Sequence, residues 1–119
     1  AVRLPYNVNP VTYAAGLATL EPDSMAYYKT LIELTKSERS RLRGNLESLG
    51  FRVRPSQTNF VLAKTESPET AKTLYGELAE NKILVRYFSD PRLADCLRIT
   101  VGMPEENDRL IAKIGELLG

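Results

Sequence analysis

Apolar residues between Pro22 and Gly50 recur at steps of three and four, which is the spacing of a helix with one buried side. The Pro22-Asp23-Ser24 segment is typical of a helix start, and Gly50 can end the helix in a left-handed conformation. We therefore predict one helix over Asp23–Leu49, about 39 Å long at the usual rise per residue. A helix of this length is expected to cross from one body of a protein to another.

The segment before this helix divides into two parts. Residues 1–10 contain two prolines and two asparagines, and they are expected to form an irregular arm. Residues 11–20 read VTYAAGLATL, which is apolar on every side of a helix, so this short helix must be buried against something. Its burial is easier to explain if the covering surface belongs to the rest of a larger protein. The chain also begins at Ala1 rather than at a methionine.

After Gly50 the pattern changes to the alternation and the short apolar runs that are typical of strands. The expected strands are Phe51–Arg54, Asn59–Ala63, Ile83–Arg86 and Leu97–Val101. A second helix is predicted between Ser67, which caps it, and Asn81, which is expected to close it in the left-handed conformation. The apolar stripe of this helix is expected to consist of Ala71, Leu74, Tyr75 and Leu78.

Pro104 begins the last predicted helix, because proline fits the first helical position. The apolar face of that helix is expected to consist of Leu110, Ile111, Ile114 and Leu117. The order of elements is then long helix, strand, strand, helix, strand, strand, helix. This order predicts an α+β fold in which a small sheet of about four strands is covered by helices.

Composition narrows the classes of function. With 119 residues, of which 43% are hydrophobic and 26% charged, the chain is expected to form one globular domain. A net charge of +1 gives no electrostatic footprint for nucleic acid or for an anionic membrane. The chain contains no apolar run near the roughly 20 residues that span a bilayer, and no signal-peptide pattern opens it. The single cysteine, Cys96, cannot form an internal disulfide, which fits a cytoplasmic location.

The chain contains no histidine. This absence removes histidine-containing metal sites, histidine-based catalytic triads and any imidazole proton shuttle. The acidic residues are scattered along helical faces, so no metal site is predicted. Ser56 has no base partner in the sequence and is not expected to be an activated nucleophile.

Two arginines lie in or at the end of apolar strands and are the candidate site residues. In the segment Leu97–Val101, alternation places Arg98 and Thr100 on one face of the strand. Arg86 ends the preceding strand, where the chain leaves the sheet. A guanidinium group beside a hydroxyl suits a carboxylate or a phosphate. The alternative is a pair of surface arginines, one bound to Glu105 or Asp95 and the other stacked on Tyr87, and the local pattern alone favours it.

Several segments taken together resemble the C-terminal portion of histidinol-phosphate aminotransferase, a fold-type I pyridoxal-phosphate enzyme of the class I/II aminotransferases. The matching segments occur in order along essentially the whole chain. They are Leu4-Pro5-Tyr6-Asn7, the passage from Glu38-Arg39 to Gly50-Phe51, Pro55-Ser56-Gln57-Thr58-Asn59-Phe60-Val61-Leu62, Ile83-Leu84-Val85-Arg86, and Leu97-Arg98-Ile99-Thr100-Val101-Gly102 with Pro104-Glu105-Glu106-Asn107.

The resemblance implies roles for the two arginines and for the cofactor. Arg98 would bind the acidic group of the substrate, which is the α-carboxylate of glutamate or the phosphate of histidinol phosphate, and Arg86 would help to hold the phosphate or the distal carboxylate. Pyridoxal 5'-phosphate would be bound mainly by a large domain outside this chain, on a lysine upstream of it. The chain itself would then contribute no catalytic, cofactor-binding or metal-binding residue, and it would be inactive alone.

The resemblance also implies a domain arrangement, a reaction and partners. Residues 1–21 would be an arm and short helix at the edge of the large domain, and residues 22–119 the small C-terminal domain. The whole enzyme would be a cytoplasmic homodimer that transfers an amino group between histidinol phosphate and 2-oxoglutarate in histidine biosynthesis.

Three alternatives stay open. The chain could belong to an aromatic or other amino-acid aminotransferase of the same family. It could be a non-catalytic amino-acid-binding α+β module of the ferredoxin-like type, although such modules usually open with a strand rather than a long helix. It could also be a structural dimerisation domain, which internal pairing of Arg86 and Arg98 with acidic residues would favour.

Overall fold

The computed structural model describes residues 8–119, so the Leu4–Asn7 segment and most of the expected arm lie outside the described residues. The elements are α1 (Pro10–Ala18), α2 (Pro22–Ser48), β1 (Arg52–Val53), β2 (Phe60–Lys64), α3 (Pro68–Glu80), β3 (Arg86–Tyr87), β4 (Cys96–Thr100) and α4 (Pro104–Leu118). This is the predicted α+β element order, preceded by a short helix. The chain divides into two compact units, one ending at Glu33 and the other covering Leu34–Gly119.

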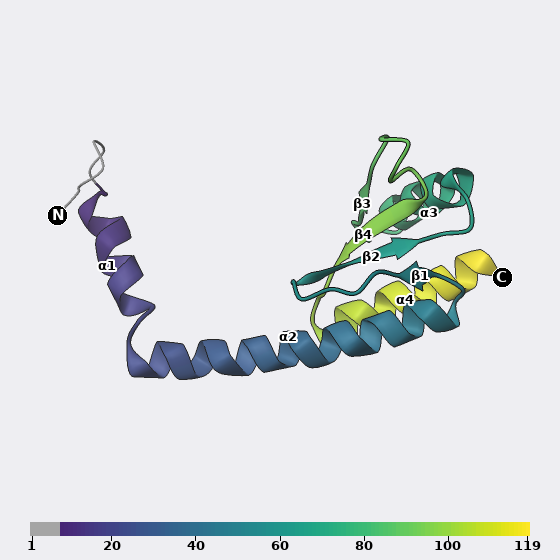
Figure 1. The fold of residues 1–119 in the computed structure, drawn as a ribbon. Helices are drawn as coiled ribbons and strands as arrows, with labels where there is room; N and C mark the ends of the chain where they lie inside the picture. The colour runs from purple at the N-terminus through teal and green to yellow at the C-terminus, as the bar shows by residue number, and fades with distance from the viewer. Residues whose placement is uncertain (1–7) are drawn as a thin grey trace. The chain divides into compact units, whose positions relative to one another are not determined.

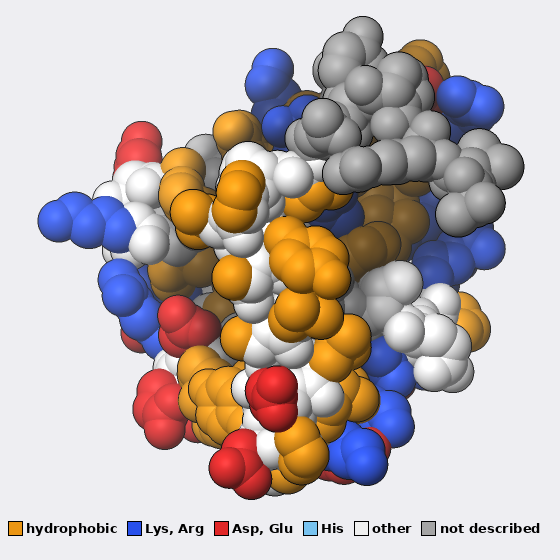
Figure 2. Space-filling view, turned by 90° about the vertical axis from the view of Figure 1, so that its left-hand side faces the viewer, with side chains coloured by type: hydrophobic (Ala, Val, Ile, Leu, Met, Phe, Trp, Pro, Cys, Tyr) orange, Lys and Arg blue, Asp and Glu red, His pale blue; other side chains and the backbone are white. Residues whose placement is uncertain are grey.

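The unit that ends at Glu33 consists of α1 and the first part of α2, and its apolar side chains are exposed. Helix α1 is capped by Asn9, whose side chain accepts a hydrogen bond from the Thr12 amide at 2.9 Å. No residue of α1 is buried. The exposed hydrophobic residues of this unit are Val8, Val11, Tyr13, Leu17, Leu20, Met25, Tyr27, Tyr28, Leu31 and Ile32. Figure 2 shows hydrophobic side chains on the face that it draws, interspersed with charged and other side chains.

Two helices of the second unit end with the same backbone motif. At the end of α2, Gly50 has a φ of 90°, and the Phe51 amide donates to the Leu46 carbonyl at 3.1 Å. This confirms the predicted role of Gly50. At the end of α3 the prediction for Asn81 is wrong, because Asn81 has a φ of −85°. The left-handed residue is Lys82, with a φ of 58°, so the helix continues one residue further than expected before it turns.

The four strands form one antiparallel sheet in the order β1-β2-β4-β3. The central pair, β2 and β4, is in register from Phe60 opposite Thr100 to Lys64 opposite Cys96. Edge strand β3 is shorter than the predicted Ile83–Arg86 strand and pairs with β4 only through Arg86 and Tyr87. The prediction fails there because the Ile83 amide donates to the Leu78 carbonyl and so completes the end of α3 instead of joining the sheet.

The core lies between the helices and one face of the sheet, with α4 running beside the second half of α2 (Figure 1). Its buried members come from the second half of α2, from β1 and the residue before it, from β2 and β4, and from α3 and α4. Tyr87 of β3 packs against them and is partly buried. The buried members include Leu42, Leu46, Val61, Ala63, Leu74, Leu78, Leu97, Ile99, Leu110 and Ile114. The predicted apolar faces of α3 and α4 are therefore confirmed, except that Tyr75 remains 40% exposed. Within Leu34–Gly119 the helices pack on one face of the sheet, and the face that carries Arg98 and Thr100 is exposed.

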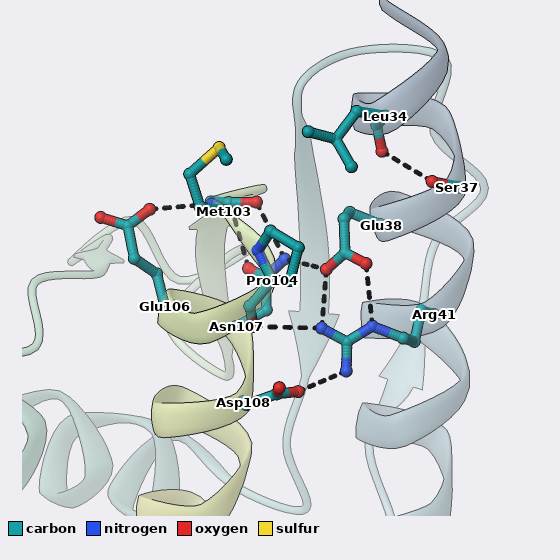
Figure 3. Close-up of polar contacts among 10 residues, drawn as sticks. Leu34, Ser37, Glu38, Arg41, Met103, Pro104, Glu106, Asn107 and Asp108 are labelled. Carbon is teal, nitrogen blue, oxygen red and sulfur yellow. Dashed lines mark hydrogen bonds and ion pairs between the residues drawn. The ribbon is translucent and has the colours of Figure 1, made fainter. Parts of the chain in front are cut away.

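A buried polar contact joins α2 to α4 and to the end of β4 (Figure 3). The Asn107 amide donates to the Glu38 carboxylate at 2.8 Å and to the Gly102 carbonyl at 3.0 Å, while its oxygen accepts from the Gly102 amide at 3.0 Å. Arg41 donates to the same carboxylate at 2.7 Å and also binds Asp108. No local pattern of the sequence indicates this network, which holds the chain where it leaves β4.

The Glu38 contact makes stability depend on pH. Hydrogen bonds first from Arg41 and then from Asn107 hold the pKa of Glu38 below its ordinary value of 4.5. The charged carboxylate therefore stabilises the fold above that value, and this contribution is lost as the pH falls through the lower folded pKa. We expect Glu38→Gln to lower the free energy of unfolding by about 2 kcal/mol at pH 7. The deficit relative to wild type should shrink steadily below about pH 4.5.

Urea unfolding of the two proteins between pH 7 and pH 3 measures this difference. The matched control is Glu47→Gln, which removes an exposed carboxylate that pairs with Arg43 on the same helix and should change stability little at either pH. A Glu38→Gln deficit that stays constant across the range would contradict the assignment.

Candidate functional site

Arg86 and Arg98 are direct cross-strand partners in the β3–β4 register. On β4 the side chains of Leu97 and Ile99 are buried, whereas Arg98 and Thr100 are exposed, as the alternation of the sequence predicts. Directly opposed residues of an antiparallel pair point to the same face, so both guanidinium groups rise from the exposed face of the sheet. The two candidate residues, 12 positions apart in sequence, are thus neighbours in the fold.

Neither guanidinium group has an ion pair or a hydrogen bond within residues 8–119. The alternative partner Asp95 is bound instead to Lys64, at 2.5 Å, and Glu105 forms no ion pair with either arginine. The two arginines lie near aromatic rings. The Arg98 guanidinium is 5.4 Å from the centre of the Phe60 ring, and that of Arg86 is 5.8 Å from the centre of the Phe88 ring. The alternative in which Arg86 stacks on Tyr87 is wrong, because its guanidinium lies over Phe88, and the Tyr87 ring packs on Tyr75.

Two like charges on opposed positions of neighbouring strands repel each other. The aromatic rings give each cation a weak attraction of its own, but they do not remove the positive charge. An anion that lies between or above the two groups would remove the repulsion and would accept hydrogen bonds from both. Thr100 adds a hydroxyl on the same face of β4, and Leu62 lies next to Arg98 on β2. The arrangement is therefore suited to a carboxylate or a phosphate attached to a partly apolar molecule.

Other side chains that could carry chemistry have structural roles. Burial raises the pKa of the Cys96 thiol to about 11, so the thiol stays protonated at neutral pH. The Ser56 hydroxyl donates to the Phe60 carbonyl at 2.6 Å, which fits the prediction that it is not an activated nucleophile. Within the described range, no cluster of three or more acidic, cysteine or histidine side chains could hold a metal ion. None of the helices there combines the length and the apolar character that crossing a membrane requires.

The two phenylalanines beside the arginines were not among the predicted site residues. Phe88 is separated from Arg86 by one residue, and in an extended segment such residues share a face, so this contact had a local signal. Phe60 had no such signal, because it comes from β2 and reaches Arg98 only through the β2–β4 register.

The repulsion between the arginines has a measurable consequence. We expect Arg86→Gln to raise the free energy of unfolding of the chain by about 0.2–1 kcal/mol at low ionic strength, because it removes one of two opposed like charges. The gain should fall as salt is added, since both groups are exposed and are screened. Arg92→Gln is the matched control, because Arg92 is bound to Asp90 at 3.1 Å and its loss relieves no repulsion. Urea unfolding at low and high salt tests this, and a salt-independent effect of Arg86→Gln would contradict the electrostatic explanation.

Comparison with known proteins shows the family to which this chain belongs. The model of the family "Aminotransferase class I and II" matches residues 1–114. Among the curated relatives, histidinol-phosphate aminotransferase 1 of Nostoc sp. is 42% identical over 118 residues, which cover 98% of this chain and 32% of that protein. The chain thus spans about a third of the length of the relatives that it matches.

Two solved structures share the fold. The histidinol-phosphate aminotransferase of Clostridium acetobutylicum superposes with a TM-score of 0.83 at 23% identity, covering 98% of this chain and 35% of that one. The corresponding enzyme of Sinorhizobium meliloti, in complex with pyridoxal-5'-phosphate, gives a TM-score of 0.74 at 24% identity, covering 81% of this chain and 27% of that one. The family match, which extends over nearly all of these residues, shows that the chain belongs to the class I and II aminotransferases.

Proposed function

We propose that this chain is the small C-terminal domain of a pyridoxal-phosphate-dependent aminotransferase that acts on histidinol phosphate, with 2-oxoglutarate and glutamate as the other pair of reactants. One observation carries the proposal: two opposed arginines without acidic partners in the described residues stand on the exposed face of the sheet. Curated relatives at about 40% identity that are histidinol-phosphate aminotransferases, among them those of Nostoc sp., Rippkaea orientalis and Synechocystis sp., support the choice of substrate. The reaction would serve histidine biosynthesis.

Arg98 would bind the acidic group of each substrate in turn. Its guanidinium presents two parallel N–H groups, which match the α-carboxylate of glutamate and the phosphate of histidinol phosphate. Arg86, directly opposite, would add a second cation where the bound group carries two negative charges or where a distal carboxylate is present. The repulsion between the two arginines would then favour the bound state, because an anion relieves it.

The lysines of this chain do not fit the attachment of the cofactor. The described structure holds Lys64 in an ion pair with Asp95 and Lys113 in one with Glu116, while Lys29, Lys36, Lys72 and Lys82 are exposed. A lysine that forms a Schiff base needs a desolvated or otherwise activated amine, which none of these surroundings provides. The cofactor would therefore be bound mainly by a large domain outside these 119 residues, and the chain would be inactive by itself.

The division of residues 1–119 between two domains is also part of the proposal. Residues 1–21 would belong to the edge of the large domain, and residues 22–119 would form the small domain. The exposed apolar side chains of α1 support the first assignment, because a fully exposed apolar helix is unfavourable in water. Movement of the small domain would then bring its arginines to the substrate, and the whole enzyme would work as a homodimer.

Two of the three alternatives fit the described structure less well than the proposed function does. A purely structural domain was expected to pair Arg86 and Arg98 with acidic residues, and no such pair occurs among the described residues. A free-standing binding module of the ferredoxin-like type is not expected to open with a helix as long as α2. Another aminotransferase of the same family would keep Arg98 and would differ in which side chain of the substrate it accepts.

The proposal predicts a specific defect in the full-length enzyme that carries this chain. We expect Arg98→Gln to raise the KM for histidinol phosphate about 10- to 100-fold, because it removes charge-assisted hydrogen bonds to the phosphate. Arg98→Lys should recover only part of this loss, since an ammonium group cannot bind in the bidentate mode. Arg92→Gln, the loss of an arginine that is 87% exposed and bound to Asp90, is the control and should leave the KM unchanged.

Steady-state kinetics with histidinol phosphate and 2-oxoglutarate, with the cofactor present, provide the measurement. No turnover of histidinol phosphate by the wild-type enzyme, or a KM that Arg98→Gln does not change, would refute the proposal. Turnover of an aromatic amino acid in preference to histidinol phosphate would favour the other aminotransferases of the family.

A further inference from the structure

The turn that precedes β2 holds the backbone of Phe60 by side-chain hydroxyls. The Ser56 hydroxyl donates to the Phe60 carbonyl at 2.6 Å, and the Thr58 hydroxyl donates to the same oxygen at 3.2 Å. The two hydroxyl oxygens are 3.0 Å apart, and the Thr58 amide donates to the Ser56 oxygen at 3.1 Å. The carbonyl of Phe60 is thus bound by two donors that belong to the turn.

The two hydroxyls supply the hydrogen bonds that a neighbouring strand would otherwise donate to the Phe60 carbonyl. Strand β1 pairs with β2 at Arg52 and Val53, opposite Lys64 and Ala63, and the Arg54 amide donates to the Leu62 carbonyl at 3.0 Å, which is where the pairing stops. Phe60 is the first residue of β2 and has a strand partner, Thr100 of β4, on one side only. On its other side the hydroxyls of the turn satisfy its carbonyl. The direction in which the Phe60 side chain leaves the backbone therefore depends on where the turn lies.

Arg39 fixes the turn to α2. Its guanidinium donates to the Thr58 carbonyl at 2.8 Å and to the side-chain oxygen of Gln57 at 3.4 Å. Arg39 lies in the same compact unit as the turn, one residue after Glu38, whose buried contact with Asn107 orients α2 against α4. Through these two hydrogen bonds Arg39 joins α2 to this turn.

The turn is connected to the substrate-binding candidate through the Phe60 ring. The guanidinium of Arg98 lies 5.4 Å from the centre of that ring and has no other side-chain partner in the described structure. A long arginine side chain loses considerable rotamer freedom when it is held in one position, and a fixed aromatic ring is what restricts it here. A displaced ring would leave Arg98 free to adopt orientations that do not face an anion.

We propose that Arg39 is a positioning residue for Arg98, and that it acts through the Ser56–Thr58 turn and the Phe60 ring. This inference rests on the proposed function, in which Arg98 binds the substrate anion. Arg39 itself contacts no substrate in this proposal. It keeps the turn in place, the turn holds the Phe60 backbone, and the ring keeps the Arg98 guanidinium in its binding orientation.

The first experiment follows the Arg98 side-chain N–H signal of the 119-residue chain by NMR. The Phe60 ring current shifts this signal, and Phe60→Leu gives its position without the ring. We expect Arg39→Gln to move the signal toward the Phe60→Leu position. Arg39→Lys, which can still donate to the Thr58 carbonyl, should retain most of the wild-type position. Arg43→Gln is the matched control, because Arg43 lies one turn further along α2 and is bound to Glu47 at 2.8 Å.

Ser56→Ala gives an independent version of the same test, because it removes a donor to the Phe60 carbonyl without changing α2. It should move the Arg98 signal in the same direction as Arg39→Gln, and it replaces that variant if Arg39→Gln does not fold. An Arg98 signal that stays at its wild-type position in a folded Arg39→Gln or Ser56→Ala chain would overturn the inference, whatever Arg98 binds.

The second experiment separates this inference from the proposed function in the full-length enzyme. We expect Arg39→Gln to raise the KM for histidinol phosphate about two- to fivefold with little change in kcat, because a less restricted Arg98 weakens binding uniformly. Arg39→Lys should restore most of the affinity. If Arg98→Gln raises the KM and Arg39→Gln does not, the inference alone fails. If Arg98→Gln itself has no effect, the proposed function fails and the inference fails with it.

Discussion

The register between β3 and β4 is the constraint on which the site depends, because it sets two guanidinium groups opposite each other on one face of a sheet. Such an arrangement is unfavourable in the absence of an anion, and no acidic side chain of the described structure relieves it. A shift of one residue in the register would turn one of the two arginines toward the core. The same strand pairing that stabilises the domain therefore creates a positively charged surface that is suited to an anionic ligand.

The rest of the domain keeps that register fixed and that face open. All three of its helices pack on the opposite face, where Leu97, Ile99 and Val61 are almost completely buried. The Glu38–Asn107 contact holds the backbone at Gly102, just beyond β4, and so limits how β4 can move relative to α2 and α4. At the same end of the central strand pair, where Phe60 lies opposite Thr100, Arg39 and the Ser56–Thr58 turn hold the start of β2. Both contacts come from neighbouring positions on α2.

Local signals in the sequence were sufficient to predict the helices and strands and to tell the buried face of a strand from its exposed face. Gly50, Ser67 and Pro104 mark helix ends that the structure confirms, and the alternation in Leu97–Val101 separates the buried residues from Arg98. Local signals failed where competing hydrogen bonds decided the outcome. Lys82, a residue with no strong preference for the left-handed conformation, ends α3 in place of Asn81, and the Ile83 amide completes that helix end instead of the sheet.

The candidate site itself was predictable only in part. The two arginines could be singled out, because charged residues in apolar strands are unusual, but their opposition depends on a register that a single sequence does not reveal. The same holds for Phe60 beside Arg98 and for the burial of Asn107, since each arises from contacts between distant segments. The resemblance to aminotransferases supplied the chemistry that spacing and composition could not, and the family match agrees with it.

The most direct test of a joint anion site is a titration of the 119-residue chain with inorganic phosphate, followed by NMR of the side-chain N–H signals of Arg86 and Arg98. One shared site predicts that both signals move together, with the same midpoint, and that the Arg92 signal stays in place. The midpoint should rise with added sodium chloride, because the interaction is electrostatic. If neither signal moves, or if the two move with different midpoints, the two arginines do not form a single binding site.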